Sequence, residues 1–249
     1  MTIADAYSAG AIAWDAGPMR VYRPLAAELV ARSPVPLSGS KVLDLGAGTG
    51  AVSLALPEAR VVAVDRAPGM LLTGRDARPP AVVGDALALP FDDAAFDSVI
   101  AAFSLNHLDE PAAGLREAAR VTRGHVLASS YAAEDDHPVR RAVEQALNEH
   151  GWTVPDWYRE TKRATASLST VARTIDAVVA AGLEPVSVEQ VDVAFPELTP
   201  MDLVRWRLGM ASCADYAGNP ALEQRSLQLL GDHIPTLVRV VIFTVARAL

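Results

Sequence analysis

Three glycines alternate with other residues in Gly46-Ala47-Gly48-Thr49-Gly50, directly after the apolar run Val42-Leu43-Asp44-Leu45. Glycine permits positive φ and lets a ligand approach the backbone closely, because no Cβ stands in the way. A strand that runs into such a loop and then into a helix is typical of nucleotide-binding sites, although a tight turn without a ligand has the same pattern. We therefore expect these glycines to bind a nucleotide-type ligand.

The spacing of the glycines discriminates between ligands. It is G-x-G-x-G, whereas a dinucleotide site has G-x-G-x-x-G, whose last glycine lets the helix pack closely beneath a pyrophosphate. An acid in the preceding strand, Asp44, is an odd neighbour for a phosphate but suits a cationic ligand end such as an amino group. The segment therefore favours a cationic nucleoside and disfavours a nicotinamide-dependent dehydrogenase.

Two further acids follow the next two apolar runs. Asp65 comes 19 residues after Gly46, where an acidic side chain can accept both ribose hydroxyl hydrogens. Asp85 follows the third run, where it can accept from an adenine amino group. Each acid alone is equally compatible with a helix cap or a turn. Because ligands of open α/β sheets bind at the carboxyl ends of strands, acids at successive strand ends indicate one site.

Short apolar runs separated by helical stretches predict the elements that position these residues. Continuous hydrophobicity is typical of parallel strands covered on both faces by helices. The predicted strands are 42–45, 61–64, 81–83, 98–101, 125–128, an edge strand at 186–193 and a final strand at 238–245. The predicted helices lie within 1–40, 51–56, 70–75, 112–121, 134–170, 171–181 and 200–232.

Composition excludes several classes of protein. Hydrophobic residues make up 51% and charged residues 21%, which is too apolar for disorder. No apolar run approaches the roughly 18 residues of a membrane span, and no basic patch precedes an apolar stretch at the start. The single cysteine, Cys213, excludes a disulfide framework, and the net charge of −8 argues against nucleic acid as a partner. We expect a cytoplasmic protein without a nucleic-acid or membrane partner.

Four segments together resemble successive motifs of the class I S-adenosylmethionine-dependent methyltransferases, and most closely the small-molecule enzymes of the ubiquinone/menaquinone type. They are residues 42–50, 64–70, 84–91 and 96–100. The resemblance covers about residues 40–130. It implies an α/β fold with a Rossmann-like, doubly wound, seven-stranded sheet whose last strand is antiparallel. It also implies that S-adenosylmethionine is the cofactor and lies across the first four strands.

Carried over by position, the glycine loop would pass under the methionine part of the cofactor and Asp44 would lie near its amino group. Asp65 would hold the ribose, and Asp85 the adenine edge. The expected cofactor-binding residues are Asp44, Gly46, Ala47, Gly48, Gly50, Asp65, Arg66, Met70, Asp85, Ala86 and Phe103. The resemblance further implies one domain over 1–249, with a helical lid at 1–40, a cofactor-binding core at 41–133, and helical substrate-cap insertions at 134–170 and 199–232.

The acceptor would meet the methyl group at the end of the fourth strand. His107 is the candidate general base, since its unperturbed pKa of about 6.5 suits proton removal near neutrality, and its alternative is a structural role. Asn106 is a candidate substrate contact or a helix cap. The aromatic residues Tyr7, Trp14 and Tyr22 are candidate acceptor contacts from the lid, with core packing as the alternative.

A metal site is not expected. Asp135, Asp136 and His137 are adjacent in the chain and cannot all face one ion without a tight turn.

We therefore expect a methyltransferase that moves a methyl group to O, N or C of a small, largely apolar metabolite, such as a natural-product intermediate, by in-line SN2 transfer. The alternative is a protein of the same fold that binds S-adenosylmethionine without methyl transfer, as a cyclase or binding module. Monomer and homodimer both stay open.

Overall fold

A computed structural model describes residues 1–75 and 79–249. Within these residues the strands form one seven-stranded sheet in the order β3-β2-β1-β4-β5-β7-β6. The strands are β1 (Lys41–Leu45), β2 (Arg60–Asp65), β3 (Ala81–Val83), β4 (Phe96–Ala102), β5 (Thr122–Tyr131), β6 (Leu183–Phe195) and β7 (Leu237–Ala248). Strands β1 to β5 pair in parallel, and β7 runs antiparallel to both β5 and β6. The predicted fold class is confirmed.

The strand order creates a crevice beside the glycine loop. The chain moves outward from β1 to β2 and β3, then returns to the other side of β1 to form β4. In open α/β sheets such a reversal of direction separates the connections at the carboxyl ends of two neighbouring strands, and ligands bind in that gap. The β1–β4 pair is therefore the position at which the fold offers a ligand site.

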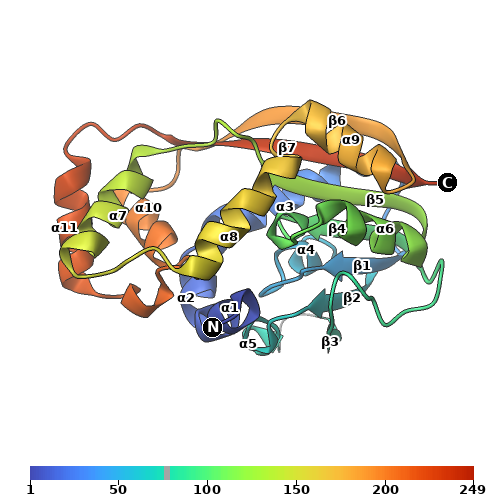
Figure 1. The fold of residues 1–249 in the computed structure, drawn as a ribbon, viewed down its shortest axis with the longest axis horizontal. Coiled ribbons are helices and arrows are strands. Elements are labelled where there is room, and N and C mark those ends of the chain that lie inside the picture. The colour runs from blue at the N-terminus through green and yellow to red at the C-terminus, as the bar shows by residue number, and fades with distance from the viewer. Residues whose placement is uncertain (76–78) are drawn as a thin grey trace.

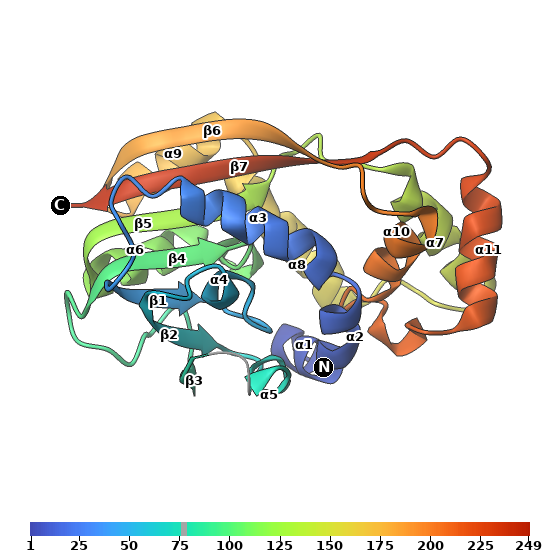
Figure 2. The ribbon, with the colours of Figure 1, turned by 180° about the vertical axis from the view of Figure 1, so that it is seen from behind.

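Both faces of the central strands are buried, as their continuous hydrophobicity predicted. Val42, Ile100 and Leu127 belong to a core cluster with the buried residues of α3. The alternate residues Leu43 and Val99 belong to a second cluster with α6 and α9 on the opposite face. Figures 1 and 2 show α3 on one side of the sheet and α6 and α9 on the other. The helices named are α3 (Met19–Ala31), α6 (Pro111–Val121) and α9 (Val171–Ala180).

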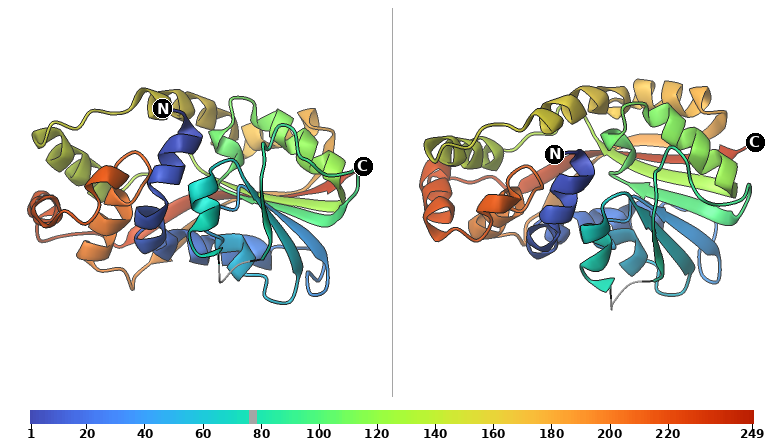
Figure 3. Two further views of the ribbon diagram at one scale, coloured as in Figure 1. Left: turned by 90° about the horizontal axis from the view of Figure 1, so that it is seen from below. Right: turned by 60° about the horizontal axis from the view of Figure 1, so that its bottom comes forward.

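Helices also gather beyond one end of the sheet, where β6 and β7 extend past the other strands (Figure 1). They are α7 (Pro138–Glu149), α10 (Pro200–Leu208) and α11 (Pro220–Leu230), and α8 (Asp156–Ala164) leads from them back toward the sheet. The helix pair α1 (Ile3–Ala9) and α2 (Ala11–Ala16) lies between these helices and the sheet (Figure 3). The helical character predicted for 1–40, 134–170 and 200–232 is confirmed.

The short helices at the carboxyl edge differ slightly from prediction. The helix α4 (Ala51–Leu54) ends two residues early, and α5 (Pro68–Leu72) starts before the predicted residue 70. Proline at the first position of α5 has its φ fixed near the helical value, which favours that start. Among the described residues no helix combines the length and apolar character needed to cross a membrane.

Candidate functional site

A cavity of about 170 Å³ opens at the carboxyl ends of β1, β2 and β4 and is bordered by α1 and α5. The predicted cofactor residues that line it are Gly46, Ala47, Gly48, Asp65, Arg66, Met70, Asp85, Ala86 and Phe103. The predicted acceptor contacts Tyr7, Trp14, Tyr22 and His107 line it as well. The strand ends thus bring together residues that are separated by up to a hundred positions in the sequence.

The backbone of the glycine loop is hydrogen-bonded to the end of β2. Leu45 lies level with Val64 in the sheet, so the N–H groups of Gly46 and Ala47 both donate to the Val64 carbonyl oxygen, at 2.8 and 2.9 Å. The next glycine, Gly48, donates to Oδ2 of Asp65 at 2.8 Å. A phosphate-binding loop needs free N–H groups that point at the ligand. These three are already used, which supports a site for a ligand other than a pyrophosphate.

Two of these glycines are required by their surroundings. Gly46 and Gly48 have φ of +72° and +55°, a region that side-chain-bearing residues rarely adopt. A Cβ added at Gly46 would lie 2.2 Å from Cβ of Ser104, which follows β4 and donates from Oγ to the Leu45 carbonyl oxygen. The loop therefore passes so close to the end of β4 that only glycine fits.

Asp65 lies at the centre of the charged wall of this cavity. Its Oδ1 accepts from the Ala67 N–H at 2.8 Å, so both carboxylate oxygens are held in place by backbone donors. A carboxylate oxygen can accept more than one hydrogen bond, so a ligand hydroxyl can also donate to this carboxylate. The other charged residues that line the cavity are Asp85 and Arg66, whose nearest atoms are 3.9 Å apart. The described wall thus carries a net charge of −1 and suits a cationic ligand.

Asp44 and Gly50 are the two predicted cofactor-binding residues that do not line the described cavity. Asp44 is buried, and its Oδ2 accepts from both the N–H and the hydroxyl of Ser53, at 3.0 and 2.6 Å. This carboxylate therefore caps the start of α4 from below and does not line the cavity. Gly50 has φ of +103° as the residue that begins α4, and it does not line the cavity either.

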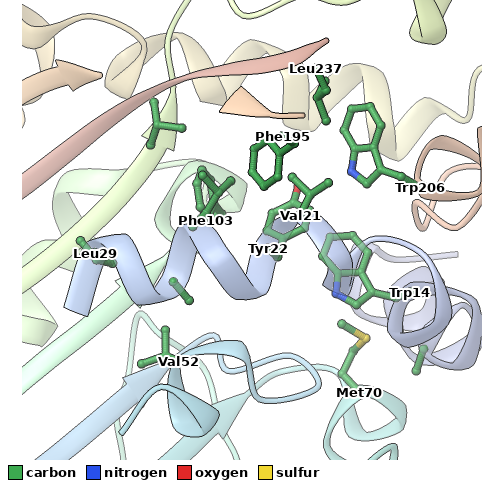
Figure 4. Packing of buried hydrophobic residues seen from close by; sticks show 14 of the residues in the cluster. Trp14, Val21, Tyr22, Leu29, Val52, Met70, Phe103, Phe195, Trp206 and Leu237 are labelled. Carbon is green, nitrogen blue, oxygen red and sulfur yellow. The ribbon is translucent and has the colours of Figure 1, made fainter. Parts of the chain in front are cut away.

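A second cavity, of about 380 Å³, adjoins the first. Tyr7, Tyr22, Phe103 and His107 line both cavities and so form their shared wall. Figure 4 shows Tyr22 between Phe103 and Trp14, and the ring centroids of Tyr22 lie 5.3 Å from Phe103 and 4.8 Å from Trp14. Large rings in such contact make a rigid, largely apolar partition between the two spaces.

Helix α1 brings Tyr7 to this wall. The hydroxyl of Ser8 accepts from the Gly69 N–H at 3.2 Å, and a Cβ at Gly69 would lie 2.3 Å from the Ser8 carbonyl oxygen. The close approach of α1 to α5 therefore depends on glycine at this position. The Tyr7 hydroxyl then lies 3.3 Å from Nε2 of His107.

His107 is half-buried in a short turn after β4, and desolvation lowers its pKa to about 4. Its Nδ1 is buried and makes no hydrogen bond within the described part of the chain. The ring is therefore neutral at physiological pH. The unperturbed pKa of about 6.5 therefore does not apply here, and an imidazole with a pKa near 4 is a weak base. The role of His107 as general base stays a prediction.

Several residues singled out in the sequence lie outside the first cavity and have other partners. Asn106 lines the second cavity, where the predicted substrate contact stays a candidate. In the segment 135–137, Asp135 pairs with Arg239 and Asp136 with Arg141, while His137 accepts from the Val139 N–H as the cap of α7. The adjacent acids are thus engaged with arginines.

The sequence analysis missed most of the second cavity. The residues it did not single out include Tyr131, Tyr158, Trp206, Arg207 and Arg239. They come from β5, α8, α10 and β7, which are far apart in the sequence. No motif connects them, and only the tertiary fold of the helical part brings them together.

Comparison with known proteins agrees with this geometry. Residues 43–128 match the model of a methyltransferase domain. A demethylmenaquinone methyltransferase of Mycolicibacterium gilvum is 47% identical over 109 residues, which are 43% of this chain and 46% of that protein. The chain thus spans about half the length of the curated relatives it matches.

Two solved structures have the same fold. One is described as a methyltransferase from an antibiotic biosynthesis pathway of Anabaena variabilis, with a TM-score of 0.62, 18% identity, and coverage of 92% of this chain and 99% of that one. The other is the [4+2]-cyclase SpnF, with a TM-score of 0.56, 19% identity, and coverage of 90% and 80%. Residues 43–128 thus match a methyltransferase domain, and the two solved structures share the fold of the chain. The resemblance to class I S-adenosylmethionine-dependent methyltransferases that the four sequence motifs show is confirmed for the matched segment.

We expect Gly46→Ala to destabilise the protein more than Gly39→Ala. The two glycines have nearly the same φ, +72° and +71°, so each substitution costs about 1–2 kcal/mol for the left-handed backbone. Only at position 46 does the new Cβ collide with Ser104, because nothing lies within 4 Å at position 39. Urea unfolding measures the difference, for which overpacking adds about 1–3 kcal/mol. Equal losses would contradict the close approach of the loop to β4.

The ring of His107 is expected to titrate near pH 4 by NMR, with its signal assigned by its absence in His107→Asn. Because the folded-state pKa lies below the unfolded value of about 6.5, the unfolded chain binds the proton more readily between these values. Stability from the neutral ring is therefore full above pH 6.5 and is lost as the pH falls toward 4. A midpoint near 6.5 in the folded protein would show that the ring is solvated.

Proposed function

We propose that this chain is a methyltransferase that uses S-adenosylmethionine to methylate O, N or C of a small, largely apolar acceptor. The observation that carries the proposal is the negatively charged cavity at the carboxyl ends of β1, β2 and β4, whose aromatic wall it shares with a second cavity. Two adjoining cavities can hold a donor and an acceptor side by side, and in-line transfer needs the methyl carbon and the acceptor atom to meet, about 3–3.5 Å apart, where the cavities adjoin.

The residues present fit the proposed cofactor. S-adenosylmethionine carries a sulfonium and an ammonium against one carboxylate, so its net charge of +1 complements the wall formed by Asp65, Asp85 and Arg66. Asp65 would accept hydrogen bonds from the ribose hydroxyls, and Asp85 with Ala86 would meet the adenine edge. Gly46 and Gly48 would leave room for the methionine part. The sulfonium supplies an activated methyl group, so alignment is the protein's main task.

We also propose roles for the parts of the chain around the cofactor-binding core. Residues 1–249 would form one domain, in which the helices of 1–40 act as a lid and those of 134–170 and 199–232 cap the acceptor. The position of Tyr7 and Tyr22 in the wall of both cavities supports this. His107 is neutral and hydrogen-bonded to Tyr7. It would orient the acceptor, and it would act as a base only for an acceptor whose proton is already labile.

The acceptor is proposed from this chain's own cavity and not from the names of its relatives. Those relatives are named demethylmenaquinone methyltransferases. Of the described residues that line the second cavity, only Phe103, Asn106 and His107 fall within the matched segment 43–128. We propose a cytoplasmic enzyme that acts on a free metabolite, as a monomer or a homodimer, and the net charge of −8 argues against nucleic acid as a partner.

Asp65→Ala is expected to weaken S-adenosylmethionine binding by about 1.5–3 kcal/mol, the usual value of a hydrogen bond to a charged group. Isothermal titration calorimetry of the wild type and the variant measures the loss. The matched control is Asp92→Ala, an exposed aspartate outside both cavities, which should bind like the wild type. Thermal unfolding reports separately on the hydrogen bonds that Asp65 makes to the loop.

Wild-type affinity in Asp65→Ala would remove the ribose assignment, and no binding by the wild type would remove the proposed function. Mass spectrometry of acceptor libraries incubated with the enzyme and S-adenosylmethionine should find a product with one added methyl group. Tight binding together with a product of unchanged methyl content would favour the cyclase or binding-module alternative.

A further inference from the structure

The second cavity contains a buried cation that lacks a hydrogen-bond partner on one nitrogen. Arg239, near the start of β7, is 7% exposed. Its Nε and Nη2 donate to the two carboxylate oxygens of Asp135, whereas Nη1 is buried and has no partner within the described part of the chain. A buried donor without an acceptor is costly, and a charged one more so. An oxygen of a ligand in this cavity would satisfy it.

Arg239 is held rigidly in that position. Its guanidinium carbon lies 3.8 Å from the ring centroid of Tyr131 and 4.8 Å from that of Trp206. Asp135 is itself fixed, because its Oδ1 also accepts from the Val240 N–H at 2.9 Å. A guanidinium fixed between a carboxylate and two rings loses little further freedom when it binds an anion, which favours its use as a recognition group.

The described charges around the cavity do not cancel. Arg239 is neutralised by Asp135, and Asp136 by Arg141 outside the cavity. The remaining carboxylate, Glu144, is shared by two arginines: Arg207 donates to its Oε1 at 2.8 Å, and Arg140 to the same oxygen at 3.2 Å. Those pairings leave one positive charge in excess.

The tyrosines and histidines that line the second cavity are uncharged, so they do not change this excess of one positive charge. Burial raises the pKa of Tyr7, Tyr22 and Tyr131, so these phenols remain protonated. Burial lowers the pKa of His107 and of His137, and His137 is further engaged as an acceptor at Nδ1. The described wall therefore has a net charge of +1, opposite in sign to that of the first cavity.

We propose that the second cavity binds an acidic acceptor: an apolar or aromatic molecule with a carboxylate, one oxygen of which accepts from Nη1 of Arg239. This inference rests on the proposed function only in taking the occupant to be the methyl acceptor. The rings of Tyr22, Phe103, Tyr131 and Trp206 supply the apolar surface for its body. A volume of about 380 Å³ fits a small molecule.

The position of Arg239 also orients the acceptor. Arg239 stacks on Tyr131, and the Tyr131 ring lies 4.5 Å from Phe103, which belongs to the wall shared with the first cavity. The carboxylate is therefore about one ring away from that wall. The methylated atom is then near the acidic end of the acceptor and not at its far apolar end.

Binding of matched acids and amides tests this proposal without knowledge of the natural acceptor. The probes are 1-naphthoate, cinnamate and decanoate, each compared with its own primary amide by calorimetry near neutral pH. We expect at least one acid to bind the wild type about tenfold or more tightly than its amide, as a charge-assisted hydrogen bond predicts. Amides that bind as tightly as all three acids would overturn the proposal.

Two double variants test whether Arg239 causes the preference for the acid over the amide. In Arg239→Met combined with Asp135→Asn, no buried carboxylate is left unpaired, and the asparagine keeps an acceptor oxygen for Val240. This double variant should lose the preference for the acid. Arg247→Met combined with Glu184→Gln is the matched control, because it removes a solvent-exposed ion pair that also involves β7. It should keep the preference, and thermal unfolding confirms that both variants fold.

Titration of the same samples with S-adenosylmethionine separates the two proposals. A folded Arg239→Met, Asp135→Asn variant that still prefers the acid would overturn the role of Arg239, whatever the cofactor result. A wild type that prefers the acid but does not bind S-adenosylmethionine would support the anion site and refute the methyltransferase function. We expect both ligands to bind the wild type, and the double variant to keep its cofactor affinity.

Discussion

The attachment of the glycine loop to the end of β2 is the constraint on which the site depends. One carbonyl oxygen, that of Val64, accepts two consecutive N–H groups of the loop, and the carboxylate of Asp65 accepts the next. The loop can follow this path only with positive φ at Gly46 and Gly48. As a result, the loop presents little free backbone N–H, and the nearest fixed charge is an anion. The same three hydrogen bonds thus shape the cavity and hold a negative charge in its wall.

The two cavities differ in charge and share a wall. The first has a described net charge of −1 from Asp65, Asp85 and Arg66, whereas the second has an excess of +1 from its arginines. The described residues shared by the two cavities are three aromatic side chains and a neutral histidine: Tyr7, Tyr22, Phe103 and His107. The two net charges complement the proposed cationic donor on one side and the proposed acidic acceptor on the other.

Much of the fold could be predicted because the signals are local. Runs such as Val61–Val64 are continuous in hydrophobicity, and the structure confirms that alternate residues of the central strands face opposite core clusters. Most of the residues that line the first cavity could be named from the sequence for the same reason, since glycine or aspartate marks the end of each strand. The hydrogen bond between Asp44 and the hydroxyl of Ser53 could not be predicted, because it depends on how α4 folds back over β1.

The second cavity could not be predicted, for a physical reason. In the sequence, Arg239 is a single charged residue within an apolar strand. Its partner Asp135 is 104 positions away, and nothing in the sequence indicates that the two residues form an ion pair. The pKa of His107 likewise depends on burial beneath α1, which the local segment does not reveal. Long-range pairs and desolvation are properties of the assembled helical part, whereas glycine spacing is a property of one loop.

A crystal structure of the protein with S-adenosylhomocysteine tests the central claim most directly. The account predicts that the nucleoside occupies the cavity at the ends of β1, β2 and β4, with both ribose hydroxyls about 3 Å or less from the carboxylate oxygens of Asp65. A nucleoside bound elsewhere, or one whose ribose faces away from Asp65, would contradict it.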